Sequence, residues 1–147
     1  MADALSKQID KLLSKMSLTE KAGLLGGAGE FNTRGYKKYN IPEMILSDGP
    51  HGVRHQEGGG DHLGLAQSLP ATCFPSASIL ACSWDPENAE KVGATLAEEA
   101  ASQNVGTMLG PGLNMKRSPL CGRNFEYFCE DPYLAGKMAA GYIRGIQ

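Results

Sequence analysis

Apolar residues recur at helical spacing in three stretches of the chain. In residues 4–16 they lie on one face of an expected helix, with lysines and an aspartate opposite; these apolar residues are Leu5, Ile9, Leu12, Leu13 and Met16. The same spacing appears in residues 85–104 and from residue 131 to the C-terminus, and an Asp-Pro pair suited to a helix start opens each stretch. A fourth, shorter helix is expected from Ser17, because Ser17-Leu-Thr-Glu20 has capping-box spacing.

Two short apolar runs have the character of strands. Residues 43–47 end at Asp48 and turn at once through Gly-Pro, and residues 105–109 follow directly on the second long helix. The order of a helical hairpin, strand, loops, helix, strand, loop and helix is typical of parallel β/α units, so the expected fold class is α/β. Two strands cannot form a parallel sheet that is buried on both faces. Either the sequence is a fragment of a larger α/β body, or another chain supplies the missing strands.

Composition narrows the function classes. The 147 residues suit one domain, 41 % are apolar, and the net charge is −2, with 14 basic residues that form no stripe, so a nucleic-acid partner is not expected. No apolar run approaches the roughly 20 residues that span a bilayer, and the N-terminus lacks the apolar core of a signal peptide. A cytoplasmic protein without a membrane partner is expected. The four cysteines form no Cys-x-x-Cys pair, so a zinc knuckle is not expected, and in a chain without a secretory signal the thiols are expected to be reduced and packed.

Asp48 is the first candidate site residue. The carboxyl end of a buried strand is where α/β proteins place groups that face a ligand, and a carboxylate there suits a hydroxyl-rich substrate. Alternatively, an aspartate before Gly-Pro caps its own turn. Arg54, at the end of the same turn, either contacts the substrate or pairs with a carboxylate to hold the loop.

A second group of charged residues follows the second strand. Arg123 comes after a glycine that allows close approach, so its guanidinium could face a cleft. Its neighbours suit an arginine–carboxylate network that holds a long loop, namely Arg117, Glu126, Glu130 and Asp131.

Neither a metal nor a cofactor is expected. His51 and His55 are four residues apart, and His62 adjoins Asp61, but the glycines around them argue for a flexible loop over residues 55–68 rather than a helix that presents both rings. The glycine-rich stretches 23–29 and 106–112 carry no phosphate-binding motif and are read as turns.

Four stretches of the chain resemble glycoside hydrolase family 3, the β-glucosidase and exo-glycosidase group. They are residues 18–25, 47–54 (Ser-Asp-Gly-Pro-His-Gly-Val-Arg), 72–86 and 110–132, the last containing Gly-Arg-Asn-Phe-Glu. The resemblance implies the N-terminal part of a (β/α)₈ TIM-type barrel, incomplete in this chain. Residues 1–30 would be leading helices, and residues 43–147 the first β/α units with their substrate-binding loops. It also implies that Asp48 and Arg123 line the −1 sugar subsite.

The same resemblance implies the activity. The complete protein would be a retaining, exo-acting β-glycosidase, most simply a β-glucosidase, that hydrolyses terminal β-linked sugars by double displacement. The family's nucleophile and acid/base residues come later than Gln147, so no residue here is expected to be catalytic and the segment alone should be inactive. Its expected partners are a β-glucoside or oligosaccharide and the remainder of the enzyme, in cis or as a separate chain. The alternatives are a non-catalytic sugar-binding or assembly module and a hexosaminidase.

Overall fold

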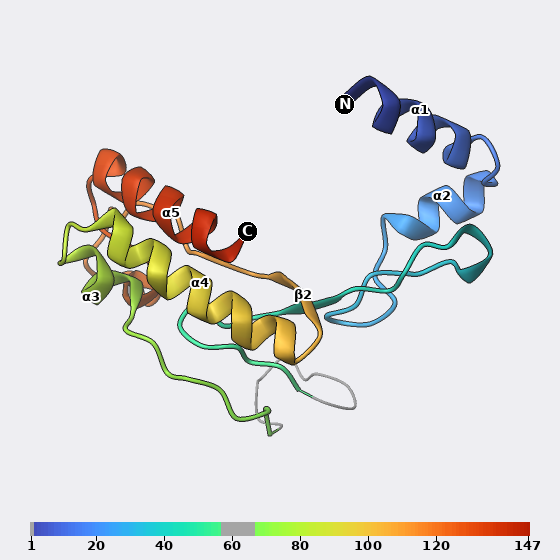
Figure 1. The fold of residues 1–147 in the computed structure, drawn as a ribbon. Helices are drawn as coiled ribbons and strands as arrows, with labels where there is room; N and C mark the ends of the chain where they lie inside the picture. The colour runs from blue at the N-terminus through green and yellow to red at the C-terminus, as the bar shows by residue number, and fades with distance from the viewer. Residues whose placement is uncertain (1, 57–66) are drawn as a thin grey trace.

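A computed structural model describes residues 2–56 and 67–147, and the elements follow the expected order (Figure 1). Of the expected loop 55–68, residues 57–66 lie outside the described part, and with them Asp61 and His62. The helices are α1 (Ala2–Leu13), α2 (Leu18–Leu24), α3 (Ala77–Ala81), α4 (Pro86–Ser102) and α5 (Pro132–Ile146), with 3₁₀ turns η1 (Lys37–Tyr39) and η2 (Asn124–Glu126). The strands are β1 (Ile45–Ser47) and β2 (Val105–Met108).

The predicted helix starts are confirmed. The Asp85 side chain accepts hydrogen bonds from the backbone N–H groups of the first turn of α4, and Asp131 does the same for Tyr133 at 2.8 Å in α5. A proline occupies the first turn of both helices, where its missing N–H costs nothing. Ser17 and Glu20 form the capping box of α2.

β1 and β2 form a parallel pair, with Ile45 opposite Val105 and Ser47 opposite Met108. A register irregularity separates Ile45 from Leu46. On the other edge of β1, the backbone of residues 31–33 runs antiparallel, and the Leu46 N–H donates to the Phe31 carbonyl at 2.7 Å. Both strands therefore end at the same edge, and the chain leaves β1 at Asp48.

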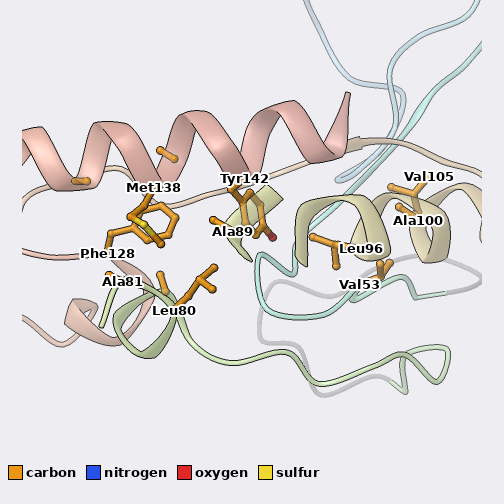
Figure 2. Packing of buried hydrophobic residues seen from close by; sticks show 13 residues of the cluster. Val53, Leu80, Ala81, Ala89, Leu96, Ala100, Val105, Phe128, Met138 and Tyr142 are labelled. Atoms are coloured by element: carbon orange, nitrogen blue, oxygen red, sulfur yellow. The ribbon is translucent and has the colours of Figure 1, made fainter. Parts of the chain in front are cut away.

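The core lies between α4 and α5 and extends toward the two strands (Figure 2). Leu96 of α4 and Met138 of α5 are fully buried, and Phe128 packs edge-on against Tyr142 with ring centroids 6.5 Å apart. The residues that give these two helices their apolar spacing face the core: Ala89 and Ala100 of α4 are buried, while Leu134 and Ile146 of α5 are partly buried against the cluster.

One expectation about packing needs correction, and two features could not be read from the sequence. The apolar face of residues 4–16 is exposed at its N-terminal end, where Leu5 is 58 % and Ile9 47 % exposed, and Figure 1 places α1 and α2 away from the α4–α5 pair. The four cysteines are free, but Cys73, Cys82 and Cys121 are exposed rather than packed. Helix α3 was not predicted, because five residues are too few to show a period and its start depends on the Ser76 cap.

A polar cluster joins α2 to η1. Glu20 pairs with Lys38, and its Oε2 accepts from the Ser17 backbone N–H at 2.9 Å. The Tyr39 hydroxyl lies 2.9 Å from both this Oε2 and the Lys15 carbonyl. The Lys38 contact, followed by the Ser17 and Tyr39 hydrogen bonds, lowers the pKa of Glu20 to about 2.

We expect Glu20→Gln to weaken this junction less than Glu20→Ala. Glutamine can still accept from the Ser17 N–H and loses only the charge, whereas alanine loses the capping box as well. Because the folded-state pKa lies below 4.5, the charge stabilises the fold above that pH and the effect is lost as the pH falls toward 2. Amide hydrogen exchange in Leu18–Leu24 at pH 7 should be fastest for alanine and intermediate for glutamine. Equal rates in all three proteins would contradict the prediction.

Candidate sugar-binding site

Backbone hydrogen bonds close the turn after β1. The Arg54 N–H donates to the Asp48 carbonyl at 3.0 Å, and the Gly52 N–H donates to the Gly49 carbonyl at 3.1 Å. Gly49 has φ +118°, and a Cβ there would lie 1.8 Å from the Gly52 oxygen, so only glycine fits. Within the described residues, the Asp48 carboxylate accepts no hydrogen bond, and the residue is exposed. The carboxylate does not cap its own turn, which leaves its oxygens available to a ligand.

The Asp48–Arg54 turn is held from behind by α5. The Tyr142 hydroxyl, on a residue that is only 2 % exposed, donates to the Pro50 carbonyl at 2.6 Å, and burial raises the pKa of Tyr142. Gly110, just after β2, lies against the same proline: a Cβ there would be 2.8 Å from Pro50 Cβ. The turn is thus packed against both the second strand's end and the last helix.

His51 joins this turn to α3. Its Nε2 accepts a hydrogen bond from the Ala77 N–H at 2.9 Å, so the ring is neutral at this contact and carries its proton on Nδ1. Desolvation lowers the pKa of His51, and the Glu126 carboxylate partly opposes that shift. The His51 ring also meets the Phe125 ring edge-on, with centroids 6.4 Å apart. The turn after β1 therefore adjoins η2 in the loop after β2.

The loop after β2 presents Arg123 to solvent. The Arg123 Nε donates to Glu126 Oε1, and the guanidinium carbon lies 5.9 Å from the Tyr127 ring centroid. The Arg123 side chain is 70 % exposed and that of Glu126 only 16 %. This ion pair raises the pKa of Arg123, which stays charged.

Ser78 anchors the same loop to α3. Its hydroxyl lies 3.2 Å from the carbonyls of Asn124 and Tyr127 and 3.4 Å from that of Phe125. The Lys116 ammonium donates to the same hydroxyl at 2.6 Å. The backbone that carries Arg123 is therefore attached at several points to the scaffold that holds Asp48.

The other predicted residues take different roles. Arg54, Arg117 and Glu130 are exposed, and within the described residues none of them forms an ion pair. The arginine–carboxylate network predicted from the sequence is therefore replaced by other contacts. Glu126 pairs with Arg123, and Asp131 caps α5. Arg117 and Glu130 have opposite charges, but in the part of the chain that the structure describes they form no ion pair with each other.

Sequence reasoning missed the residues that support the site, namely Tyr142, Ser78 and Gly110. Tyr142 belongs to the apolar spacing that runs from residue 131 to the C-terminus, and spacing does not show where a hydroxyl points. The tyrosine hydroxyl in an apolar face could have indicated a contact with another segment, because a buried tyrosine O–H normally has a hydrogen-bond partner.

Neither a metal-binding cluster nor a membrane-spanning helix occurs in the part of the chain that the structure describes. In residues 2–56 and 67–147 no group of three or more His, Cys, Asp or Glu residues is arranged to hold a metal ion. No helix in that part of the chain combines the length and the apolar character needed to cross a membrane.

β1 and β2 are parallel and each is followed by helix, as in the β/α units of a barrel, of which the described residues form an unclosed part. The model of the glycosyl hydrolase family 3 N terminal domain matches residues 36–147, and the chain belongs to this family. The resemblance read from the sequence motifs is thereby confirmed.

Relatives agree with the assignment. The chain is 52 % identical to a thermostable β-glucosidase B of Acetivibrio thermocellus over 139 residues, which is 95 % of this chain and 18 % of that protein. It is 46 % identical over 133 residues to an exo-α-(1→6)-L-arabinopyranosidase of Bifidobacterium longum, covering 90 % and 18 %. The structure of a β-glucosidase from Kluyveromyces marxianus in complex with glucose matches with a TM-score of 0.87 at 36 % identity, covering 95 % and 16 %. The chain thus spans about a fifth of the length of these relatives.

Proposed function

We propose that this chain forms the first part of the catalytic barrel of a retaining, exo-acting β-glycosidase, with β-glucosides as substrates. Residues 1–30 are the leading helices, and residues 43–147 supply the first β/α units and one wall of the −1 sugar subsite. The remainder of the barrel, in cis or as a separate chain, supplies the nucleophile and the acid/base residue. The observation that carries this proposal is the exposed Asp48 carboxylate at the carboxyl end of β1, which accepts no hydrogen bond from any residue that the structure describes.

The two charged residues have complementary roles toward a sugar. The Asp48 carboxylate accepts hydrogen bonds from two neighbouring hydroxyl groups, and the Arg123 guanidinium donates to neighbouring hydroxyl oxygens. Both act on groups that do not react, so they bind and orient the sugar while the bond is broken elsewhere. Two carboxyl groups about 5–5.5 Å apart, contributed from beyond this chain, perform the double displacement, and no metal is needed.

The proposal is tested by following hydrolysis of an aryl β-glucoside by the protein that contains this chain. A retaining enzyme releases β-glucose first, which proton NMR distinguishes from the α-anomer before mutarotation. An aryl α-L-arabinopyranoside is the comparison substrate, because one relative carries that activity in its name. Absence of turnover on both substrates, or release of the inverted anomer, would refute the proposal.

Arg123→Lys separates the role of charge from that of the planar fork. We expect roughly a tenfold or greater loss of affinity for a glucose-like inhibitor, because an ammonium cannot pair with Glu126 through one nitrogen and donate to the sugar through two others. Inhibitor binding is measured by competition against the aryl β-glucoside. An unchanged inhibition constant would return Arg123 to a purely structural role.

A further inference from the structure

The Glu126–Arg123 pair has a specific chemical geometry. Glu126 engages the Nε of Arg123, which is the inner nitrogen of the guanidinium. The two outer nitrogens donate to no group within the described residues and keep four N–H donors for another partner. An arginine paired only to hold a loop can use the two-pronged geometry, which engages an outer nitrogen as well.

Glu126 lies in a turn whose backbone is anchored to α3 on both sides of it. The Glu126 side chain is mostly buried although the arginine that it contacts is exposed, and it closes η2, whose carbonyls surround the Ser78 hydroxyl. The nearby His51, which meets the Phe125 ring and is neutral through its bond to Ala77, carries no charge that competes for the carboxylate. Glu126 is thus the buried partner of the pair, and Arg123 is the exposed one.

We propose that Glu126 is a positioning residue that orients the Arg123 guanidinium toward the −1 sugar before the sugar binds. This inference rests on the proposed function and assigns to Glu126 a task beyond holding the loop. An arginine that is not held must lose side-chain freedom when the sugar arrives, and that cost is subtracted from the affinity. Fixing Nε in advance removes this cost and leaves the outer nitrogens for the sugar.

The experiment is a double-mutant cycle in the full-length enzyme. The variants are Glu126→Gln, Arg123→Ala and their combination, each assayed for the affinity of a glucose-like inhibitor and for kcat and KM. Glu126→Gln alone should weaken inhibitor binding about three- to tenfold. In the Arg123→Ala background the same change should have no further effect, since there is no arginine left to orient.

Two controls accompany the cycle. Glu130→Gln removes an exposed carboxylate from the same loop that has no ion pair in the described residues, and it should leave affinity unchanged. Glu126→Asp keeps the charge but shortens its reach, so it should fall between wild type and glutamine. The thermal unfolding temperature of every variant is measured in parallel to show whether a substitution disturbs the fold. If Glu126→Gln does so, Glu126→Asp still tests the positioning role.

The possible outcomes separate the two proposals. The positioning role would be overturned if Glu126→Gln weakened inhibitor binding by the same factor in the Arg123→Ala background as in the wild type. It would also be overturned if Glu126→Gln alone left the affinity unchanged. If Asp48→Ala and Arg123→Ala both leave inhibitor binding intact, the sugar subsite itself is misplaced, and the proposed function fails with it. Loss in those two variants with no effect of Glu126→Gln would leave the proposed function standing and remove only this inference.

Discussion

Replacing Asp48 by alanine is expected to lower kcat/KM of the complete enzyme for an aryl β-glucoside by about 10- to 10⁴-fold. The estimate follows from losing one or two hydrogen bonds to a charged group, at about 1.5–3 kcal/mol each. The turn should survive the change, because it is closed by backbone bonds from Arg54 and Gly52 and by the Tyr142 hydroxyl, none of which involves the carboxylate.

The controls for this prediction test charge and location separately. Asp48→Asn keeps the size and one oxygen acceptor, so it should lose less than alanine. Glu98→Ala removes an exposed carboxylate from α4 and should leave kcat/KM unchanged. Kinetics of Asp48→Ala within threefold of wild type, with an unchanged unfolding temperature, would show that Asp48 does not contact the sugar.

The sequence predicted the elements whose signals are local. The Asp-Pro starts of α4 and α5 and the Ser17 capping box depend only on neighbouring residues, and all are formed as expected. The positions of β1 and β2 followed from apolar runs bounded by turns, and the predicted ends differ from the observed ones by no more than two residues. Asp48 could be placed at a strand end for the same reason.

Features that depend on contacts between distant segments could not be predicted from local sequence patterns. Helix α3 is stabilised at its start by His51, 26 positions away, and no local pattern contains that bond. The arginine–carboxylate pairs were assigned by charge alone, and the structure selects Glu126 for Arg123 because both lie around the η2 turn. An apolar helix face indicates that something covers it but not what, as the exposed Leu5 and Ile9 illustrate.

The contact between α4 and α5 carries the largest expected effect on folding. Gly145 of α5 approaches α4 so closely that a Cβ would lie 2.0 Å from the Glu90 carbonyl oxygen, and a Cβ on Gly93 would lie 2.2 Å from that of Tyr142. Both obstacles are backbone atoms, which cannot rotate away. Gly145→Ala must therefore push the helices apart, at a cost of about 3 kcal/mol, and loosen the burial of Met138.

Gly136 provides a control within the same helix, since a Cβ there meets nothing within 4 Å. Alanine has the higher helix propensity, so Gly136→Ala should stabilise α5 by roughly 0.5–1 kcal/mol. Amide hydrogen exchange in α4 and α5 measures both changes: opening should become about 100-fold more frequent in Gly145→Ala and a few-fold rarer in Gly136→Ala. The opposite signs are the decisive feature, because propensity alone would make both substitutions stabilising. If Gly145→Ala also slowed exchange, the two helices could not approach as closely as the structure places them. The position of α5, and with it the contact of Tyr142 with the Asp48–Arg54 turn, would then be contradicted.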